Sequence, residues 1–227
     1  MTHHIIGYGQ IGQSVGKVLG KHSHGDRNDK LLLADIGHVC FPWQPNFVEK
    51  VKKIADFYSL TIVHSTVPIG TMDKIDRETL IYSPVRGKHP NLVPGIKTFT
   101  KYFAGVEEFC KYVMKEFRKN GVKCEFTSSY KELEAAKLLD TTYYGWNIIF
   151  AKEVKKFCDR NKLDFKLVYT KWNKTYNKGY TELGIENVVR PVLQPKDGRI
   201  GGHCVSENSE ILKNIFSPAM YITKHNK

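Results

Sequence analysis

The sequence predicts an α/β fold of the Rossmann type, with a doubly wound, mostly parallel sheet followed by a smaller, all-helical domain. Short apolar stretches alternate with stretches of helical periodicity in the first half of the chain, as in parallel sheets covered by helices. A Gly-x-Gly-x-x-Gly motif separates the first two of these stretches, and the alternation stops near residue 127. We therefore expect a Rossmann domain over residues 1–126 and a helical domain over residues 127–227, built on a long inter-domain helix.

The first predicted strand covers residues 3–6 and leads through the glycine motif into a helix. Gly7 allows a tight turn, Gly9 lets the backbone approach a pyrophosphate, and Gly12 lets the helix pack close to the strand. The free N–H groups of the helix then face the phosphates. A purely structural glycine turn is the alternative. The motif predicts a dinucleotide site made by Gly7, Tyr8, Gly9, Gln10, Ile11 and Gly12.

The second strand of such a domain should end in an acidic residue that binds the ribose hydroxyls. Residues 21–29 carry only a poor strand pattern. We expect Asp26 in this role, because Asp35 precedes the next strand instead. An acidic residue in this place favours NAD as the cofactor. Arg27 beside it would accept a 2′-phosphate, so NADP is the alternative. His22 and His24 have no third ligand nearby, so we expect a solvated loop and no metal site.

The later elements follow from the same patterns. A loop enters a buried strand over residues 34–43, and further strands are expected over residues 60–64, 81–84, 100–105 and 122–126. Helices are expected over residues 47–58, 72–80, 106–119, 130–160, 164–178 and 207–216, with Asn46 capping the first of them. The Pro/Gly-rich segment 85–95 is expected to be irregular. Its Arg86, Lys88 and His89 form a candidate anion site, with a solvated surface loop as the alternative.

Composition narrows the function classes. The net charge is +12, but the lysines are spread along the chain without an aromatic-rich basic cluster, which favours steering of anions over nucleic-acid binding. The five cysteines are scattered, so we expect free thiols in a reducing, cytoplasmic compartment. No stretch is apolar for long enough to span a membrane, and the chain enters a strand at once, so no signal peptide is expected. The long helix is a candidate homodimer interface.

An ordered set of motifs resembles the UDP-glucose/GDP-mannose 6-dehydrogenase family over essentially the whole chain. The blocks are Gly7-Tyr8-Gly9-Gln10-Ile11-Gly12, Val39-Cys40-Phe41-Pro42, Ser65-Thr66-Val67-Pro68-Ile69-Gly70-Thr71, Tyr82-Ser83-Pro84, Glu134-Ala135-Ala136-Lys137-Leu138 and Gly198-Arg199-Ile200-Gly201-Gly202-His203-Cys204. The Ser-Thr-Val-Pro and Gly-Gly-His-Cys blocks are the most specific. More distantly, the chain resembles the β-hydroxyacid and 6-phosphogluconate dehydrogenase superfamily.

The resemblance implies a two-step oxidation of a sugar C6 alcohol to a carboxylate with two NAD. Cys204 would be the thiolate that captures the aldehyde; hydride loss would give a thioester that water hydrolyses. His203 and Lys137 would be the basic groups beside it, and Lys137 would also stabilise oxyanions. Thr66 would lie near the nicotinamide or a catalytic water. A small buried thiol and a solvated helix lysine are the alternative interpretations of Cys204 and Lys137.

The resemblance also assigns binding roles. Beyond the glycine motif and Asp26, the cofactor would contact Phe41, Pro42, Ser65 and Thr66. The substrate would contact Ser83, Arg86, His89, Lys137, Thr141 and Gly202.

The chain departs from the family at three positions. The family has a glutamate, an asparagine and an aspartate where this sequence has Val85, Thr141 and Asn208. The two missing carboxylates are the obvious general bases. The sequence ends at Lys227, before the family's nucleotide-binding C-terminal domain, so a short form is expected. The redox residues are thus retained, but the residues for thioester hydrolysis and nucleotide recognition are not.

Three functions fit these observations. The first is an NAD(P)-dependent dehydrogenase that oxidises an alcohol on a small or sugar-like anionic substrate, with Cys204 as nucleophile. The second is a degenerate, non-catalytic nucleotide-binding module, favoured by the three departures. The third is another enzyme on the same scaffold, such as an S-adenosylmethionine-dependent transferase.

Overall fold

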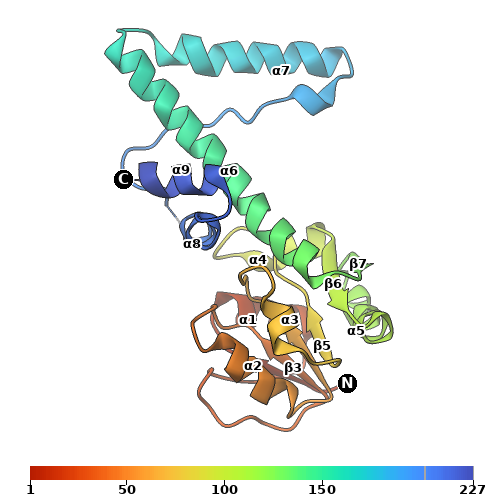
Figure 1. The fold of residues 1–227 in the computed structure, drawn as a ribbon. Coiled ribbons are helices and arrows are strands. Elements are labelled where there is room, and N and C mark those ends of the chain that lie inside the picture. The colour runs from red at the N-terminus through yellow and green to blue at the C-terminus, as the bar shows by residue number, and fades with distance from the viewer. Residues whose placement is uncertain (202, 227) are drawn as a thin grey trace. The chain divides into compact units, whose positions relative to one another are not determined.

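The computed structural model describes residues 1–201 and 203–226 (Figure 1). The chain divides into two compact units, Met1–Lys137 and Leu138–Lys227. The division lies inside the long helix α6 (Tyr130–Arg160), later than the expected boundary near residue 127. The reason is that the first turns of α6 pack on the sheet: Leu133 joins its core, and the Tyr130 hydroxyl donates to the Leu80 carbonyl at 2.7 Å.

In the first unit, the described residues form one seven-stranded sheet with the order β2-β1-β3-β4-β5-β6-β7. The strands are β1 (His3–Ile6), β2 (Ser23–Gly25), β3 (Ile36–Val39), β4 (Leu60–Val63), β5 (Leu80–Tyr82), β6 (Lys101–Gly105) and β7 (Cys124–Thr127). Neighbouring strands are parallel, except that β5 and β6 are antiparallel. Every residue of β1, β3 and β4 is buried, as expected for strands covered on both faces. The predicted doubly wound, mostly parallel sheet is therefore confirmed.

Helices cover both faces of this sheet (Figure 1). Helices α1 (Gln10–Leu19), α4 (Leu92–Thr98) and α5 (Glu107–Lys119) supply the apolar side chains of one core. Helices α2 (Phe47–Ala55) and α3 (Thr71–Ile75) supply those of the other, together with Leu133. Helix α4 begins inside the segment 85–95, which was expected to be irregular. The helix forms despite Pro94 because this proline stands in its first turn, where a missing N–H costs nothing.

The described residues of the second unit form helices joined by loops, with no strand among them, as predicted. Beyond α6 it contains the π-helical segment η1 (Lys166–Lys171), α7 (Trp172–Glu182), the short η2 (Glu186–Val188), α8 (His203–Leu212) and α9 (Ser217–His225). Its small cores join α6 to α8 and α9, for example through Leu138, Leu212 and Ala219. Gly145 makes this packing possible, because a Cβ there would lie 2.5 Å from the Val205 side chain.

Two helix predictions in this unit were wrong in their boundaries. The helix expected over 207–216 is α8, which begins and ends earlier, and α9 follows it with Pro218 in its first turn. The helix expected over 164–178 is the π-helical η1 followed by α7. No helix among the described residues is both long enough and apolar enough to cross a membrane.

Candidate functional site

The three glycines between β1 and α1 occupy three different environments. Gly7 has φ of +91°, and a Cβ on it would lie 2.7 Å from the backbone nitrogen of Phe41. A Cβ on Gly12 would run into the Gly7 carbonyl oxygen and the Ile5 side chain, so α1 packs tightly on the sheet here. No described atom lies within 4 Å of the Cβ position of Gly9. These environments suit the tight turn, the close packing and the open approach that a dinucleotide loop needs.

The loop lies where the order of strands reverses. The chain runs from β1 to β2 on one side and then to β3 on the other, so the switch point of the sheet lies between β1 and β3. Gly7 and Phe41 follow these two strands and meet there. The crevice outside the carboxyl ends of strands at a switch point is the usual ligand site of open α/β sheets.

Asp26 follows directly after β2 and is exposed. The Gly25 carbonyl, one residue earlier, accepts a hydrogen bond from Gly7 N at 2.9 Å, which holds the end of β2 beside the glycine loop. The alternative, Asp35, accepts hydrogen bonds from Thr2 N and Thr2 Oγ1 at 2.7 and 3.0 Å, ahead of β3. The structure thus puts Asp26, rather than Asp35, at the carboxyl edge.

Tyr8, the second residue of the glycine motif, packs on two histidines. Its ring stacks on His24 with centroids 3.7 Å apart, and its hydroxyl lies 3.1 Å from Nε2 of His22. Gly16 of α1 gives His22 its space, because a Cβ there would clash with the imidazole. These histidines therefore support the glycine loop, a role that the sequence analysis missed. Their proximity to a glycine motif in sequence was the only signal.

The carboxyl ends of β3, β4 and β5 carry the next predicted residues. Ser65 Oγ donates to the Phe41 carbonyl at 2.6 Å, which joins two predicted cofactor-contacting segments, and Thr66 beside it is half-buried. Pro42 is exposed. Ser83 is fully buried, and its hydroxyl donates to the Tyr102 carbonyl at 2.7 Å.

The three basic residues of the segment after β5 do not share one partner. The Arg86 guanidinium donates to the Thr100 carbonyl at 2.8 Å and lies over the Phe99 and Tyr102 rings. Nδ1 of His89 contacts the side-chain oxygen of Gln10, at the start of α1. Lys88 is exposed. His89 therefore adjoins the glycine loop, whereas Arg86 holds its own segment against β6.

Glu134 joins α6 to the segment that follows Thr66. Its side chain is fully buried, and its carboxylate accepts hydrogen bonds from Gly70 N at 2.5 Å and Met72 N at 2.9 Å. Burial raises the pKa of Glu134, and these two backbone N–H groups oppose that shift. Lys137, one turn further along α6, is half-buried.

In the second unit, Cys204 stands in the first turn of α8 and is half-buried. Asn208, one turn further, is buried and donates through Nδ2 to Thr141 Oγ1 of α6 at 2.6 Å. Gly202 and the side chain of His203 lie outside the described part of the chain. The grouping of Cys204 with Lys137 and Thr66 in one site stays a prediction.

Comparisons with known proteins find similar sequences and folds among dehydrogenases. No protein-family model matches the sequence. A UDP-N-acetyl-D-mannosamine dehydrogenase of Methanocaldococcus jannaschii is 26% identical over 167 residues, which cover 70% of this chain and 36% of that protein. The matched region therefore spans about a third of the curated relative.

Solved structures share the fold over nearly all of the chain. A UDP-D-ManNAc dehydrogenase from Pyrococcus horikoshii has a TM-score of 0.79 at 17% identity, covering 100% of this chain and 68% of that one. A UDP-glucose dehydrogenase from Pyrobaculum islandicum has a TM-score of 0.72 at 13% identity, covering 98% and 68%. The chain resembles nucleotide-sugar dehydrogenases in sequence and fold. The predicted resemblance is confirmed.

A 3-hydroxyisobutyrate dehydrogenase from Mycobacterium tuberculosis shares the fold as well, with a TM-score of 0.69 at 14% identity, covering 98% of this chain and 91% of that one.

Two of the departures from the nucleotide-sugar dehydrogenase motifs form one contact. Thr141 and Asn208 stand where those motifs have an asparagine and an aspartate, and here they are hydrogen-bonded to each other. The third, Val85, is buried in the core beneath α4, among Leu92 and Ile96. All three positions thus fit their local packing without a carboxylate.

Proposed function

We propose that this chain is an NAD-dependent oxidoreductase that oxidises an alcohol group of a sugar nucleotide or a similar anionic substrate. The observation that carries the proposal is the glycine loop at the β1/β3 switch point, where Gly7 meets Phe41 and Gly9 is open. The similarity to nucleotide-sugar dehydrogenases supports the class of reaction.

The cofactor proposal assigns a role to each group around the loop. The N–H groups at the start of α1 and the open surface at Gly9 would bind the pyrophosphate. Asp26 would bind the ribose hydroxyls, and the segments at Phe41 and Thr66 would bound the nicotinamide half. NADP is the alternative. However, the Arg27 guanidinium, which would bind its 2′-phosphate, lies 3.1 Å from the Gln44 side-chain oxygen.

Gly9→Val tests the cofactor site. A Cβ at Gly9 would enter open space, and Gly9 has φ of −73°, so the variant should fold normally. The added methyl groups would occupy the space proposed for the pyrophosphate, so NAD and NADH binding should be lost in calorimetric titration. Gly179→Val, at another open glycine, is the control. Equal binding by both variants would contradict the proposal, and binding of only S-adenosylmethionine by the unmodified chain would favour the transferase.

The catalytic proposal keeps Cys204 as the nucleophile. Its sulfur would add to the aldehyde carbon while the carbonyl oxygen takes up a proton. A bound NAD would supply the hydride acceptor that, with loss of the hydroxyl proton to water, turns this adduct into a thioester, which water would then cleave. Lys137 would stabilise the oxyanion, and Thr66 would position the reacting group. The matched motifs support these roles, and Cys204 is only partly buried, unlike the other four cysteines.

The departures at Val85 and Asn208 favour a second candidate, a nucleotide-binding module without turnover. The side chains of both residues are buried, and neither is a general base. A screen of UDP-sugars and hydroxy acids for cofactor reduction separates the candidates. The dehydrogenase should produce NADH, and Cys204→Ser should then stop after one hydride transfer. NAD binding without any reduction would favour the module.

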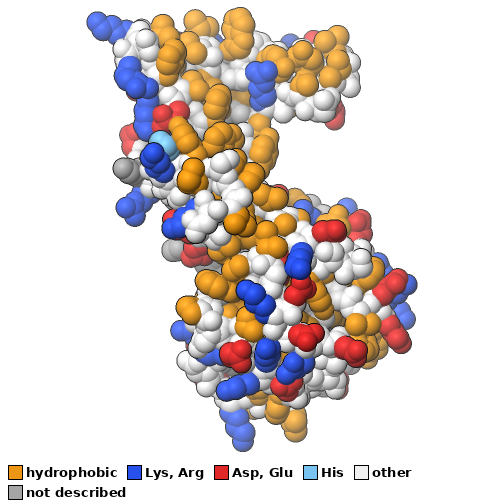
Figure 2. Space-filling view, viewed as in Figure 1, with side chains coloured by type: hydrophobic (Ala, Val, Ile, Leu, Met, Phe, Trp, Pro, Cys, Tyr) orange, Lys and Arg blue, Asp and Glu red, His pale blue; other side chains and the backbone are white. Residues whose placement is uncertain are grey.

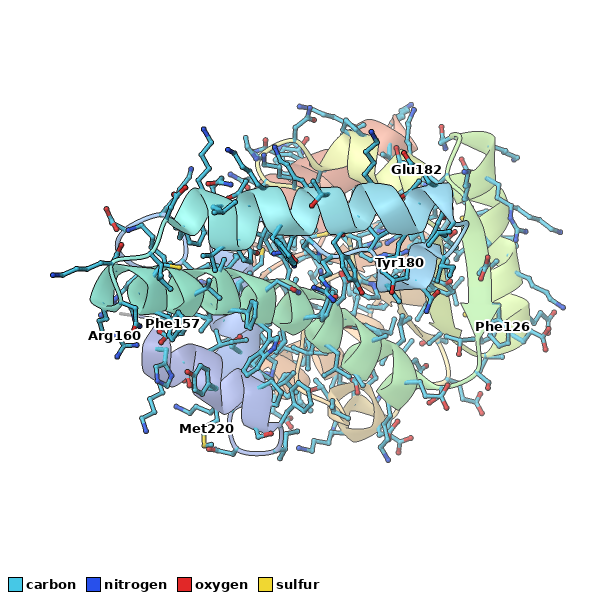
Figure 3. All side chains as sticks on the ribbon, turned by 90° about the horizontal axis from the view of Figure 1, so that it is seen from above. Phe126, Phe157, Arg160, Tyr180, Glu182 and Met220 are labelled. Atoms are coloured by element: carbon cyan, nitrogen blue, oxygen red, sulfur yellow. The ribbon has the colours of Figure 1, made fainter. Side chains whose placement is uncertain are left out.

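We also propose that the chain forms a homodimer through α6 and works in a reducing, cytoplasmic compartment. Exposed apolar side chains gather on the helices of the second unit (Figure 2). Those on α6 include Phe157, near its end (Figure 3). All five cysteines are free, and four of them are buried, which supports the reducing compartment.

A further inference from the structure

A continuous chain of buried polar side chains crosses the sheet of the first unit. His3 of β1, His38 of β3 and His64, just after β4, form this chain, which we call the histidine chain. Nδ1 of His3 lies 3.0 Å from Nε2 of His38, and Nδ1 of His38 lies 3.0 Å from Nε2 of His64. All three side chains are buried, with Phe117 of α5 packed beside the last two. Both ring nitrogens of His38 are therefore used inside the core.

A buried lysine lies next to His64, at the far end of the histidine chain. Lys101, the first residue of β6, donates through Nζ to the Ser83 carbonyl at 2.7 Å and the Pro84 carbonyl at 3.4 Å. The same Nζ lies 3.3 Å from Nδ1 of His64, which itself lies 2.8 Å from the Ser83 carbonyl. These groups tie the ends of β4 and β5 to the start of β6.

The hydrogen bonds of neutral imidazoles allow only two arrangements of this chain. A neutral imidazole carries one proton, so each contact between rings needs a donor nitrogen on one side and an acceptor on the other. If His64 carries its proton on Nδ1 and donates to the Ser83 carbonyl, its Nε2 must accept from His38, and His38 must accept from His3. If His64 carries its proton on Nε2, both bonds between the rings are reversed, and Nδ1 of His64 no longer donates to the Ser83 carbonyl.

Each charge state of Lys101 fits a different one of these two arrangements. A charged lysine has three N–H donors. It has three acceptors here only when Nδ1 of His64 is bare, which is the Nε2–H arrangement. A neutral lysine has two N–H donors for the two carbonyls, and its lone pair faces Nδ1 of His64. That nitrogen must then carry a proton.

We propose that Lys101 and the histidine chain form one protonation unit, through which a proton taken up at His3 is delivered to the buried amine of Lys101. His3 is the solvent end, because it lies at the amino end of β1 and keeps 5% of its surface exposed. A proton binds to Nε2 of His3, and the proton on Nδ1 of His3 passes to Nε2 of His38. The Nδ1 proton of His38 passes to His64, and that of His64 passes to Lys101. Each step breaks one N–H bond and forms another, so the net change is one proton gained by Lys101.

The surroundings keep the imidazoles neutral while leaving Lys101 titratable. Burial lowers the pKa of His38 and His64 well below their ordinary range. Burial also lowers the pKa of Lys101 to about 7. Other titratable or charged groups act on this unit from neighbouring elements: Cys40 after β3, Cys124 of β7, Arg86 after β5, Lys137 of α6, His22 before β2, Glu116 of α5, Asp35 before β3 and the N-terminal amine. Burial raises the pKa of both thiols, so neither should change charge near neutrality.

The unit connects to the proposed function by position. Lys101 holds the Ser83 carbonyl, and His64 directly precedes Ser65 and Thr66, which we propose to contact the cofactor. A proton on Lys101 adds a positive charge at the carboxyl ends of β4 and β5. This step rests on the proposed function. It predicts that the anionic NADH binds roughly threefold to tenfold more tightly to the protonated form.

Nitrogen NMR of the whole chain, labelled with ¹⁵N-histidine, tests the protonation unit directly, because it distinguishes bare from protonated ring nitrogens. Between about pH 6 and about pH 9 we expect the three imidazoles to stay neutral and change together from Nε2–H to Nδ1–H. One common midpoint in the unmodified protein supports the proposal. Three separate midpoints, fixed tautomers or a charged His38 would overturn it.

Two variants and a control sharpen this test. Lys101→Met should fix the Nδ1–H arrangement at every pH, whereas Lys97→Met, at an exposed lysine of α4, should leave the common midpoint unchanged. His38→Phe should keep the pH-dependent change at His64 and abolish it at His3. A change that persists in Lys101→Met, or at His3 in His38→Phe, would contradict the proposal.

NADH titrations of the same proteins at the two pH values separate this inference from the proposed function. Tighter binding at low pH, lost in Lys101→Met, supports both. If NADH fails to bind at either pH, the proposed cofactor site is wrong, and the tautomer measurement still decides the protonation unit.

Discussion

Gly7, Gly9 and Gly12 are required for different physical reasons, although they belong to one motif. Gly7 has a positive φ and touches the backbone of Phe41, so both its conformation and its space exclude a side chain. At Gly12 only the close packing against Gly7 and Ile5 excludes a larger side chain. At Gly9 no described neighbour excludes a side chain, so we attribute the need for glycine to a bound ligand.

This difference predicts opposite results for two alanine substitutions. Gly12→Ala should lower the free energy of unfolding by about 1–3 kcal/mol, because α1 must move away from the sheet. Gly9→Ala should leave stability almost unchanged, because its Cβ enters open space. Urea denaturation of both variants checks the prediction. Equal stability of the two would show that the packing at Gly12 tolerates a methyl group.

At the scale of elements, Glu134 of α6 serves as the acceptor for the start of α3. Glu134→Ala would leave the part-buried N–H of Gly70 and the buried N–H of Met72 without this acceptor, so the free energy of unfolding should fall by about 1–3 kcal/mol for each unpaired group. Glu132→Ala, on the exposed side of the same helix, is the matched control. Thermal denaturation measures both, and a small, equal effect would show that water replaces the carboxylate.

Helix α6 carries an apolar stripe with a seven-residue spacing. Tyr143, Phe150 and Phe157 are 63%, 56% and 51% exposed, and an exposed stripe of this kind favours a helical partner. Phe150→Glu should therefore convert a dimer into a monomer in sedimentation velocity. Tyr112→Glu, at a similarly exposed aromatic of α5, should not. A monomer in the unmodified protein would contradict the proposed homodimer.

At the scale of the whole molecule, the buried bases give stability an unusual dependence on pH. The folded-state pKa values of Lys101, His38 and His64 lie below their ordinary values. For Lys101 the window runs from 10.5 down to about 7, because there the unfolded chain binds a proton that the folded chain does not. Stability should fall by about 1.4 kcal/mol per pH unit across this window as pH decreases. The histidines should extend the loss below pH 6.5.

Denaturation at several pH values measures this slope, and Lys101→Met should flatten it above pH 7 while leaving the histidine part below. Lys97→Met should keep the whole profile. A flat profile for the unmodified protein between neutral and alkaline pH would show that Lys101 keeps its ordinary pKa in the fold.

Periodicity and a few special residues were enough to predict the architecture. The glycine motif, the buried strands and the proline-free stretch of α6 act locally, so their patterns are visible in sequence. Strand β2 was obscure because it is a short, partly buried edge strand. Helix α4 was hidden because Pro94 signals a break except in a first turn, and only the fold shows which turn it occupies.

The predicted site residues came from motifs, but the partners of their side chains depend on contacts between distant segments. The family resemblance assigned substrate contacts to Ser83 and Arg86, and only the fold shows that their side chains donate to the carbonyls of Tyr102 in β6 and of Thr100 just before it. Thr141 and Asn208 look like separate losses until α6 and α8 pack together.

The histidine chain and Lys101 illustrate the same limit most clearly. His3, His38, His64 and Lys101 lie far apart in sequence, and each looks like an ordinary polar residue in a predicted strand. Strand register brings them into one line inside the core, where burial lowers the pKa of all four. The sequence by itself determined the fold class, because periodicity and glycine geometry are local. Only the tertiary structure decided the pKa values of these residues, because hydrogen bonding and desolvation depend on neighbours that come from separate strands of the sheet.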